Sequence, residues 1–457
     1  MIDLQNTPSL QSLAPQLDRF FELAKSKIES IDQDYDESHG SPVFTVDGKY
    51  TTRGWTEWTE GFRYGISILH FDATEDADSL RSGRDRTVSK MASHVSHIGV
   101  HDHGFNNLST YGNLRRLMLE GRIPENEWEL HFYELAIKVS GAVQAARWTE
   151  RRGGGFIHSF NGPHSLFVDT IRSCRILMQA HLLGHRLMGE GDCSISLLER
   201  ALLHIESTAK FSVFYGDGRD IWDVAGRTTH EAIFNTKDGA YRCPNSQQGY
   251  TGFSTWTRGQ AWAAVGFSEE LELLTTLPDE ALLPFGGKAK WETLMLRAAT
   301  AIAENFIENT PTDGISYWDQ GGPDLHRLGD YLNRPADPFN EYEPVDSSAS
   351  AITAQGLLRL SRYLRDKGED EQAQRYERAG LTIAHSLFSE PYLSTSDQHQ
   401  GLLLHSIYHH PNGWDHRPDP TRAPYGESSM WGDYHAMELA VYLQRLIHSD
   451  PYLTFFR

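Results

Sequence analysis

Cysteine is scarce in this sequence. The chain has 3 cysteines among 457 residues, Cys174, Cys193 and Cys243, and none of them lies in a Cys-x-x-Cys pair. A sparse, odd set of this kind does not make a disulfide framework and is typical of a reducing compartment. The stretch from Met1 to Pro15 has no basic segment followed by an apolar one, so we expect no signal peptide and a cytoplasmic protein.

Positive charge and long apolar runs are also lacking. Lys and Arg number 42 against 62 Asp and Glu, which gives a formal net charge of −20. A surface of this sign repels nucleic acid and anionic membranes, so we expect neither as a partner. No apolar run reaches the roughly 18 residues that a membrane helix needs. A small acidic ligand held by one or two local cations is compatible with this charge.

Signatures of nucleotide sites and of serine nucleophiles are absent as well. The sequence has no P-loop, no Gly-x-Gly-x-x-Gly after a strand and no Gly-x-Ser-x-Gly elbow. The run Gly153-Gly154-Gly155 is not followed by Lys-Ser or Lys-Thr, so we interpret it as a loop. We therefore expect no cofactor.

Helical periodicity, by contrast, is abundant. Apolar residues recur at the spacing of amphipathic helices in four segments, 132–143, 291–302, 373–387 and 434–443. Apolar or small residues cover most faces of three further segments, 166–183, 259–267 and 347–360. A helix that is apolar nearly all round is buried, so the alternation of the two kinds predicts two concentric helical layers.

Strand signals are few and short, at 43–46 and 212–215. The long connections are rich in Gly, Pro, Asn and Asp, at 153–163, 238–252, 319–344 and 411–426. Loops of this length in a compact domain are usually functional. We predict an all-α fold in one domain over 1–457, with elaborate loops on one side.

Asp169 is the first residue that could carry chemistry. It lies within Leu166 to Ile171, which we predict to be part of an apolar helix. A carboxyl group in such a helix holds its proton tightly unless a cation or donor compensates, and this suits a general acid. The alternative is a structural aspartate bonded to a backbone amide or to Arg172.

A second carboxylate, Asp102, stands between His101 and His103, before a helix predicted to open at Asn106. An ionised carboxylate between two imidazoles suits electrostatic support of a positive transition state. The alternative is zinc, because His94, His97 and His101 lie at i, i+3 and i+7 and His103 follows. No established zinc spacing is present, so we predict no metal site.

A third candidate is the run from Gln248 to Trp262. Arg258 and Trp262 are four residues apart, hence on one helical face. An arginine fork can hold the carboxylate of a sugar acid while the ring packs on the apolar face of the sugar. The alternative is a buried Arg beside a packed Trp. Aromatic residues that could form sugar platforms recur in the loops: Trp55, Trp58, Phe160, Trp256, Trp318 and Trp431.

Six segments occur in an order that resembles the unsaturated glucuronyl hydrolases, glycoside hydrolase family 88. They are Trp58-Thr59-Glu60-Gly61-Phe62, His101-Asp102 with Gly104-Phe105, Asp169 in its apolar surroundings, Trp256 to Trp262, Asp346-Ser347-Ser348-Ala349 and Gly432-Asp433-Tyr434. The resemblance extends from about residue 50 to 445. It implies an (α/α)6 barrel, which agrees with the two helical layers.

The resemblance also implies roles for individual residues. Asp169 matches the general acid/base of the family, and Asp102, beside His101, matches its second essential aspartate. The substrate-binding residues of the family match His230, Gln248, Arg258, Trp262 and Trp58. Phe160 stands where the family has a sugar-stacking Trp, His103 replaces an apolar residue, and there is extra sequence between Asp169 and His230.

The reaction that the resemblance implies is removal of a 4,5-unsaturated uronic acid from the non-reducing end of a short oligosaccharide. Asp169 protonates C4, water adds to C5, and the hemiketal opens to release the remaining sugar. We expect a monomer or a small homo-oligomer, and we expect that loss of Arg258 mainly weakens substrate binding. The alternatives are an unsaturated rhamnogalacturonyl hydrolase, an α/α-barrel enzyme acting on saturated sugars and a sugar-binding protein without turnover.

Overall fold

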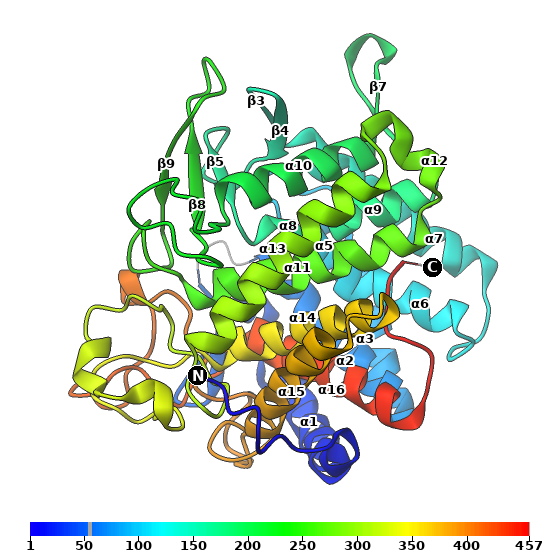
Figure 1. Ribbon diagram of the computed structural model, residues 1–457. Coiled ribbons are helices and arrows are strands. Elements are labelled where there is room, and N and C mark those ends of the chain that lie inside the picture. The colour runs from blue at the N-terminus through cyan, green and yellow to red at the C-terminus, as the bar shows by residue number, and fades with distance from the viewer. Residues whose placement is uncertain (54–56, 457) are drawn as a thin grey trace.

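A computed structural model of the chain describes residues 1–53 and 57–456. Within these residues the architecture is two rings of helices, one inside the other (Figure 1). The inner ring is formed by α2 (Glu60–Thr74), α5 (His103–Asn107) with its continuation α6 (Asn113–Leu119), α8 (Thr170–Ser173) with α9 (Arg175–Leu182), α11 (Thr257–Thr276), α14 (Ser347–Asp366) and α16 (Met430–His448). The outer ring is formed by α1 (Ala14–Asp34), α3 (Ala77–Lys90), α7 (Glu127–Ala146), α10 (Leu197–Phe211), α13 (Lys288–Glu308) and α15 (Asp370–Leu387).

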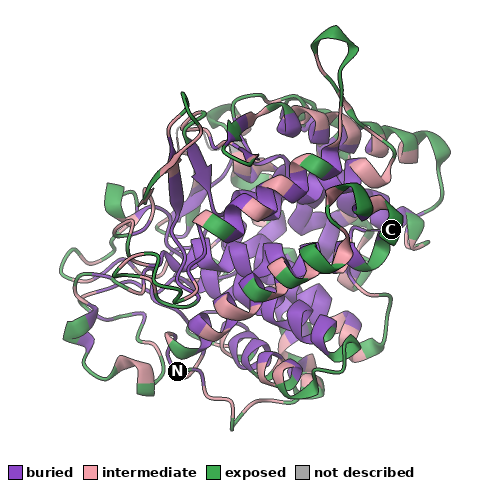
Figure 2. Ribbon diagram, turned by 45° about the horizontal axis from the view of Figure 1, so that its top comes forward, coloured by how far each residue is buried: buried purple, intermediate pink, exposed green. Residues whose placement is uncertain are grey.

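The inner ring is closed. Each inner helix contacts the next along the chain, and the last, α16, contacts the first, α2. The inner helices are buried on nearly every face, whereas the outer helices expose one side (Figure 2). The structure therefore confirms the predicted all-α barrel with two helical layers.

Inner and outer helices alternate along the chain, and this alternation decides where the loops go. An outer helix returns the chain before each new inner helix, so the inner helices run parallel and begin at the same end of the barrel. The N-caps of α5, α8 and α14 are the aspartates Asp102, Asp169 and Asp346. The positive ends of the helix dipoles thus converge at one end, where they favour negatively charged groups.

Close packing in the inner ring depends on glycine at several contacts, among them those of Gly356 and Gly104. A Cβ atom on Gly356 of α14 would lie 2.8 Å from the backbone of Ala264 and Val265 in α11. A Cβ atom on Gly104 of α5 would lie 2.1 Å from the backbone oxygen of Ser173 in α8. A larger residue at either position would force neighbouring inner helices apart.

Buried ion pairs join the inner helices further down the barrel. Arg172 of α8 contacts Glu269 of α11 at 3.2 Å and Glu438 of α16 at 2.7 Å. Arg359 of α14 contacts Glu272 of α11 at 3.0 Å. Removing one partner of such a pair leaves a buried charge, so these contacts fix the relative register of the inner helices.

The strands are short and lie in the connections. Their bounds are β1 (Phe44–Val46), β2 (Lys49–Thr51), β3 (Trp148–Arg151), β4 (Gly154–Ile157), β5 (Ser165–Phe167), β6 (Leu187–Met188), β7 (Ser194–Ile195), β8 (Glu231–Phe234) and β9 (Tyr241–Asn245). All pairings are antiparallel, in hairpins β1–β2, β3–β4 and β6–β7 and in one sheet of order β5-β8-β9. The remaining short helices include α4 (Ala92–Val95), α12 (Asp279–Leu282) and the π-helical turn η4 (Leu108–Gly112).

Several local predictions are wrong. Asp169 does not lie inside a helix: β5 ends at Phe167, and Asp169 caps α8. The helix predicted from Asn106 already begins at His103. Segment 212–215 is not a strand, since only Val213 makes an isolated bridge, to Thr228.

The apolar stripe predicted on α7 is only partly buried: Ala136 is buried and Val139 and Val143 are half-buried, but the two largest members are exposed. Phe132 and Leu135 are 42% and 59% exposed, and the buried face of α7 carries Tyr133, Ile137 and Ser140. Helical spacing identifies an apolar face, but the barrel has buried a face in which small and polar residues are interspersed. No helix among the described residues has the length and apolar character to cross a membrane.

One buried acid of α11 gives a testable consequence for stability. Glu270 is fully buried, and neither of its carboxyl oxygens has a hydrogen-bond partner among the described residues. Burial, reinforced by the charge of Glu269, raises the pKa of Glu270 well above its usual value. The folded protein keeps this proton where the unfolded chain has lost it, so this group lowers stability increasingly as the pH rises above the unfolded pKa.

Between about pH 5 and pH 7.5, the free energy of unfolding of Glu270→Gln is therefore expected to fall less than that of the wild type. The variant gains up to about 1.4 kcal/mol over the wild type per pH unit in this range. Urea unfolding at both pH values measures the gain, and Glu280→Gln, which changes an exposed glutamate of α12, is the control. Parallel pH dependence of wild type and Glu270→Gln would contradict the assignment of a buried neutral acid.

Candidate active site

A cavity of about 420 Å³ opens at the barrel end where the inner helices begin. It is lined by Trp58, Val100, His101, Asp102, Phe105, Phe160, Asn161, Phe167, Asp169, Gln247, Gln248, Trp256, Arg258, Trp262, Tyr408, His409, Asn412 and Trp414. Eight of the nine residues predicted from the sequence are in this set. The ninth, His230, lies behind the wall, with its ring 4.4 Å from that of Phe167 and 4.6 Å from that of Trp256.

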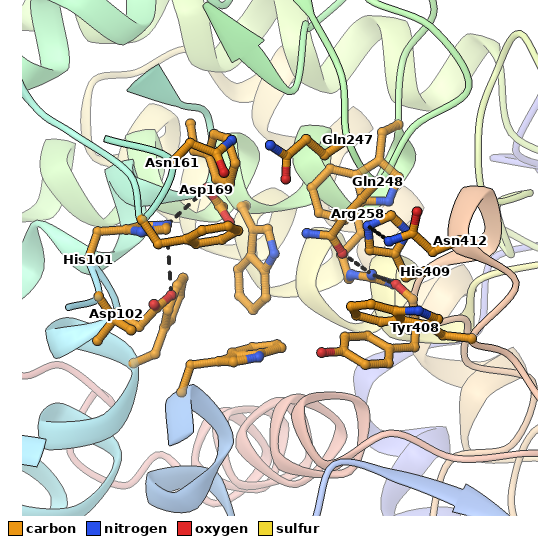
Figure 3. A pocket seen from close by; sticks show the side chains of 18 residues that line it. His101, Asp102, Asn161, Asp169, Gln247, Gln248, Arg258, Tyr408, His409 and Asn412 are labelled. Atoms are coloured by element: carbon orange, nitrogen blue, oxygen red, sulfur yellow. Dashed lines mark hydrogen bonds and ion pairs between the residues drawn. The ribbon is translucent and has the colours of Figure 1, made fainter. Parts of the chain in front are cut away.

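The two predicted carboxylates share one histidine (Figure 3). Nε2 of His101 lies 3.8 Å from Oδ1 of Asp102 and 3.8 Å from Oδ1 of Asp169. Asp102 and Asp169 cap α5 and α8, which are neighbours in the inner ring, so the barrel itself brings the carboxylates together.

These three side chains are buried, and several of their polar atoms lack hydrogen-bond partners among the described residues. His101 is 1% exposed and Asp169 is 8% exposed. Neither ring nitrogen of His101 nor Oδ1 of Asp169 has a hydrogen-bond partner in the described part of the chain. Buried polar atoms normally have partners, and such exceptions are concentrated at functional sites.

The two carboxyl groups are shifted in opposite directions. Burial raises the pKa of Asp102, helped by the charge of Asp169 and opposed by that of His101. Burial also acts to raise the pKa of Asp169, but the close interaction with His101 and the charge of the His101 ring outweigh it, so the net pKa is lowered. His101 has a raised pKa because the two carboxylates overcome its burial.

This result changes one prediction. In the free protein the carboxyl group that holds its proton more tightly is Asp102, whereas the apolar surroundings of Asp169 had suggested the reverse. No local pattern in the sequence places His101 and His230 beside Asp169. Because the three groups interact strongly, their protons titrate as those of one cluster.

His230 is held in one neutral tautomer. Its Nδ1 accepts hydrogen bonds from the backbone N–H groups of Gln247, at 3.0 Å, and Gln248, at 3.3 Å. Burial lowers the pKa of His230 to about 4. With Nδ1 acting as acceptor, the proton resides on Nε2, which is buried without a partner among the described residues and is available as a donor.

Arg258 was predicted to bind the substrate carboxylate, but its guanidinium is already bound to other groups of the protein. Its guanidinium contacts Oδ2 of Asp346 at 2.6 Å and donates to Oε1 of Gln248 at 2.9 Å. It also donates to the backbone oxygens of Ile407 and Tyr408. Both terminal nitrogens are therefore engaged, and Arg258 orients Gln248 and the 407–408 backbone at the cavity wall.

Aromatic rings form two sides of the cavity. Trp58 stacks on Trp431, with centroids 5.0 Å apart and planes at 27°. Phe160 stacks on the His101 ring at 5.9 Å, with planes at 26°. Trp262 packs against Phe105 at 4.8 Å. Flat apolar walls with polar groups between them match the alternating apolar faces and hydroxyl edges of a sugar ring.

The other aromatic candidates differ in their positions relative to the cavity. Trp256 lines the cavity, whereas Trp431 supports Trp58 from behind. Trp318 is buried, donates from Nε1 to Glu343 at 2.6 Å and is not among the lining residues. Trp55 lies outside the described residues.

The histidine set weighed as a zinc site does not converge. Nδ1 of His103 contacts the Ser140 hydroxyl at 2.8 Å, and its Nε2 contacts the backbone oxygen of His97 at 2.9 Å. Within the described ranges, the three side chains close enough to share a metal ion are Asp47, His416 and Glu427, none of which lines the cavity.

Sequence reasoning missed the wall opposite the carboxylates. Tyr408, His409, Asn412 and Trp414 line it, and Figure 3 shows Tyr408, His409 and Asn412 facing the His101, Asp102 and Asp169 group across the cavity. Nδ1 of His409 is buried without a partner in the described chain. The only signal for this wall was the length of the 411–426 loop, which does not identify individual residues.

The extra sequence between Asp169 and His230 lies at both ends of the barrel. Hairpin β6–β7 follows the C-terminal end of α9 and projects away from the β5-β8-β9 sheet (Figure 1). The second part, residues 212–226, follows the outer helix α10 and leads back toward His230. Only this second part is at the end that contains the cavity.

No protein-family model matches the chain. The unsaturated glucuronyl hydrolase of Bacillus sp. (strain GL1) is 27% identical over 411 residues, which cover 87% of this chain and 89% of that protein. The crystal structure of the Bacillus sp. GL1 enzyme has a TM-score of 0.70 at 23% identity and covers 95% of this chain and 97% of its own. A mutant Streptococcus agalactiae unsaturated glucuronyl hydrolase complexed with dGlcA-GalNAc6S has a TM-score of 0.61 at 18% identity, covering 99% and 98%.

The described residues thus form the same α/α-barrel fold as the Bacillus sp. GL1 structure, with paired carboxylates in an aromatic-lined cavity. The resemblance of the sequence to the unsaturated glucuronyl hydrolases is confirmed, and the chain is a glycosidase similar to these enzymes.

Proposed function

We propose that the enzyme removes a 4,5-unsaturated uronic acid from the non-reducing end of short oligosaccharides, with Asp169 as general acid and base. The observation that carries this proposal is the position of His101, 3.8 Å from a carboxylate oxygen of both Asp169 and Asp102. Such a cluster can hold one proton in more than one place, which a reaction that first donates and then accepts a proton requires.

The first step delivers a proton to C4 of the substrate. In the free protein His101 lowers the pKa of Asp169, so a further influence must return the proton to it. The uronate carboxylate is that influence: a negative charge entering the closed cavity raises the pKa of a nearby carboxyl group. As C4 gains the proton, positive charge develops at C5 and the ring oxygen, and Asp102, left ionised when the proton of the cluster resides on Asp169, stabilises this charge.

In the second step Asp169, now ionised, takes a proton from the water that adds to C5. The resulting hemiketal opens and releases the rest of the oligosaccharide. One carboxyl group thus serves both steps, so the carboxyl separation that distinguishes retaining from inverting glycosidases does not apply. The amide of Gln248 is assigned to polar groups of the uronate, and Trp58, Trp262 and Phe160 pack its ring.

The wild-type enzyme is expected to abolish the ultraviolet absorbance of the C4=C5 bond in lyase-generated disaccharides. In D2O one deuterium is expected at C4 of the product, delivered to a single face, because Asp169 approaches from one side. Nuclear magnetic resonance of the product measures this. Deuterium equally distributed between both faces, or attack of water at C1 with C4 unlabelled at early times, would contradict protonation by Asp169.

A further inference from the structure

Arg147 lies directly after α7 and is hydrogen-bonded to two separate segments of the chain. Its guanidinium donates to the backbone oxygens of His158 at 3.2 Å and Ser159 at 2.7 Å, and also to that of Ile98. One planar group therefore holds the 98 and 158–159 backbones at a fixed separation. A lysine cannot reproduce this geometry, because its single nitrogen cannot span three carbonyl groups.

Both of these segments lead into the active site. Ile98 is three residues before His101 and four before Asp102, and Ser159 directly precedes Phe160. The two segments meet again at the cavity, where Phe160 stacks on the His101 ring. Arg147 thus joins, from behind, the same two segments whose side chains touch at the cavity wall.

Charge links Arg147 to the same site. The hydrogen bonds of its guanidinium go to carbonyl oxygens, which carry no net charge and so do not neutralise its positive charge. Burial lowers the pKa of Arg147, and Asp102 opposes this effect. By reciprocity, Arg147 lowers the pKa of Asp102 below the value that burial and Asp169 would impose.

We propose that Arg147 is a positioning residue of the catalytic site, which ties the segment bearing His101 and Asp102 to the segment bearing Phe160 and biases the charge of Asp102. This proposal rests on the proposed function, since the charge of Asp102 affects turnover only if His101, Asp102 and Asp169 perform acid and base catalysis. The hydrogen bonds of the Arg147 guanidinium go to the backbone of Ile98, His158 and Ser159, none of which is among the residues that line the cavity.

The test compares Arg147→Met and Arg147→Lys with the wild type on an unsaturated disaccharide. The methionine variant loses the hydrogen bonds and the charge, so kcat is expected to fall about 10- to 100-fold with KM changed less than about 3-fold. The apparent pKa of Asp102, measured from the pH dependence of kcat, is expected to rise by about half a unit to one unit. The lysine variant keeps the charge and is expected to lose kcat with its pH limb close to that of the wild type.

Arg152→Met is the matched control, because Arg152 is exposed and pairs with Asp238 at the protein surface. A pH profile unmoved in Arg147→Met, with the protein folded and the control normal, overturns the inference while the proposed function stands. If Arg147→Met does not fold, an undiminished kcat in Arg147→Lys overturns it instead. Absence of turnover in the wild type refutes the proposed function itself, so the two failures are distinguishable.

Discussion

Replacing Asp169 with asparagine is expected to lower kcat by about 10³-fold or more while the barrel remains folded. The amide can neither deliver a proton to C4 nor accept one from water, so both steps of the proposed reaction fail together. The substitution changes shape little, and Oδ1 of Asp169 has no hydrogen-bond partner to lose among the described residues. We therefore expect nearly unchanged thermal unfolding and retained substrate binding.

Loss of ultraviolet absorbance in a disaccharide substrate measures the rate, and equilibrium binding of the same disaccharide measures the affinity. Asp238→Asn, which changes an exposed aspartate in the turn before β9, is the matched control for the chemical change alone. A variant at Asp169 that retains a tenth of the wild-type kcat would refute the assignment of this residue as acid and base.

Arg258→Met is expected to destabilise the protein by about 3–5 kcal/mol, because it leaves the buried Asp346 carboxylate without its ion-pair partner. The sequence alone had suggested that loss of Arg258 mainly weakens substrate binding. The structure changes this expectation, since Arg258 is 2% exposed and its guanidinium lies between Trp256 and Trp431, 4.8 and 5.0 Å from their rings.

Urea unfolding of Arg258→Met, Asp346→Asn and the double variant measures the coupling. The double variant is expected to recover part of the stability, because it removes both charges together. Asp346 also accepts from the backbone N–H of Ser348 at the start of α14, so recovery is incomplete. Stability within about 1 kcal/mol of the wild type, with a large rise in KM, would instead restore Arg258 to direct binding of the substrate carboxylate.

The fold could be predicted because its signal is repeated along the chain. Segments 259–267 and 347–360 are apolar or small on most faces, and both prove to be inner helices. The stripe on α7 misled because periodicity shows which face of a helix is apolar but not which face the barrel covers. Asp169 was misplaced because a three-residue strand followed by a helix has the same apolar composition as one buried helix.

The candidate site was predicted in part from local patterns and in part from resemblance. Asp102 and His101 are adjacent in sequence, so their pairing is visible there. The proximity of His230 to Asp169 is not visible in the sequence, because it depends on the antiparallel pairing of β8 with β5. Next to this pairing, the backbone N–H of Val168 donates to the backbone oxygen of His230 at 2.9 Å. Tyr408, His409 and Trp414 come from an irregular loop, whose path depends on contacts that no short-range pattern encodes.

Because the inner helices run in the same direction, the loops that shape the cavity and the loops that do not lie at opposite ends of the barrel. Connections that enter an inner helix supply the walls of the cavity, whereas connections that leave one lie at the opposite end, as β6–β7 does. Insertions at the opposite end can accumulate without altering substrate choice, and exchange of entering loops can alter it without rebuilding the barrel. An engineer seeking a new specificity would therefore graft the 158–163 and 407–414 segments and leave the helices untouched.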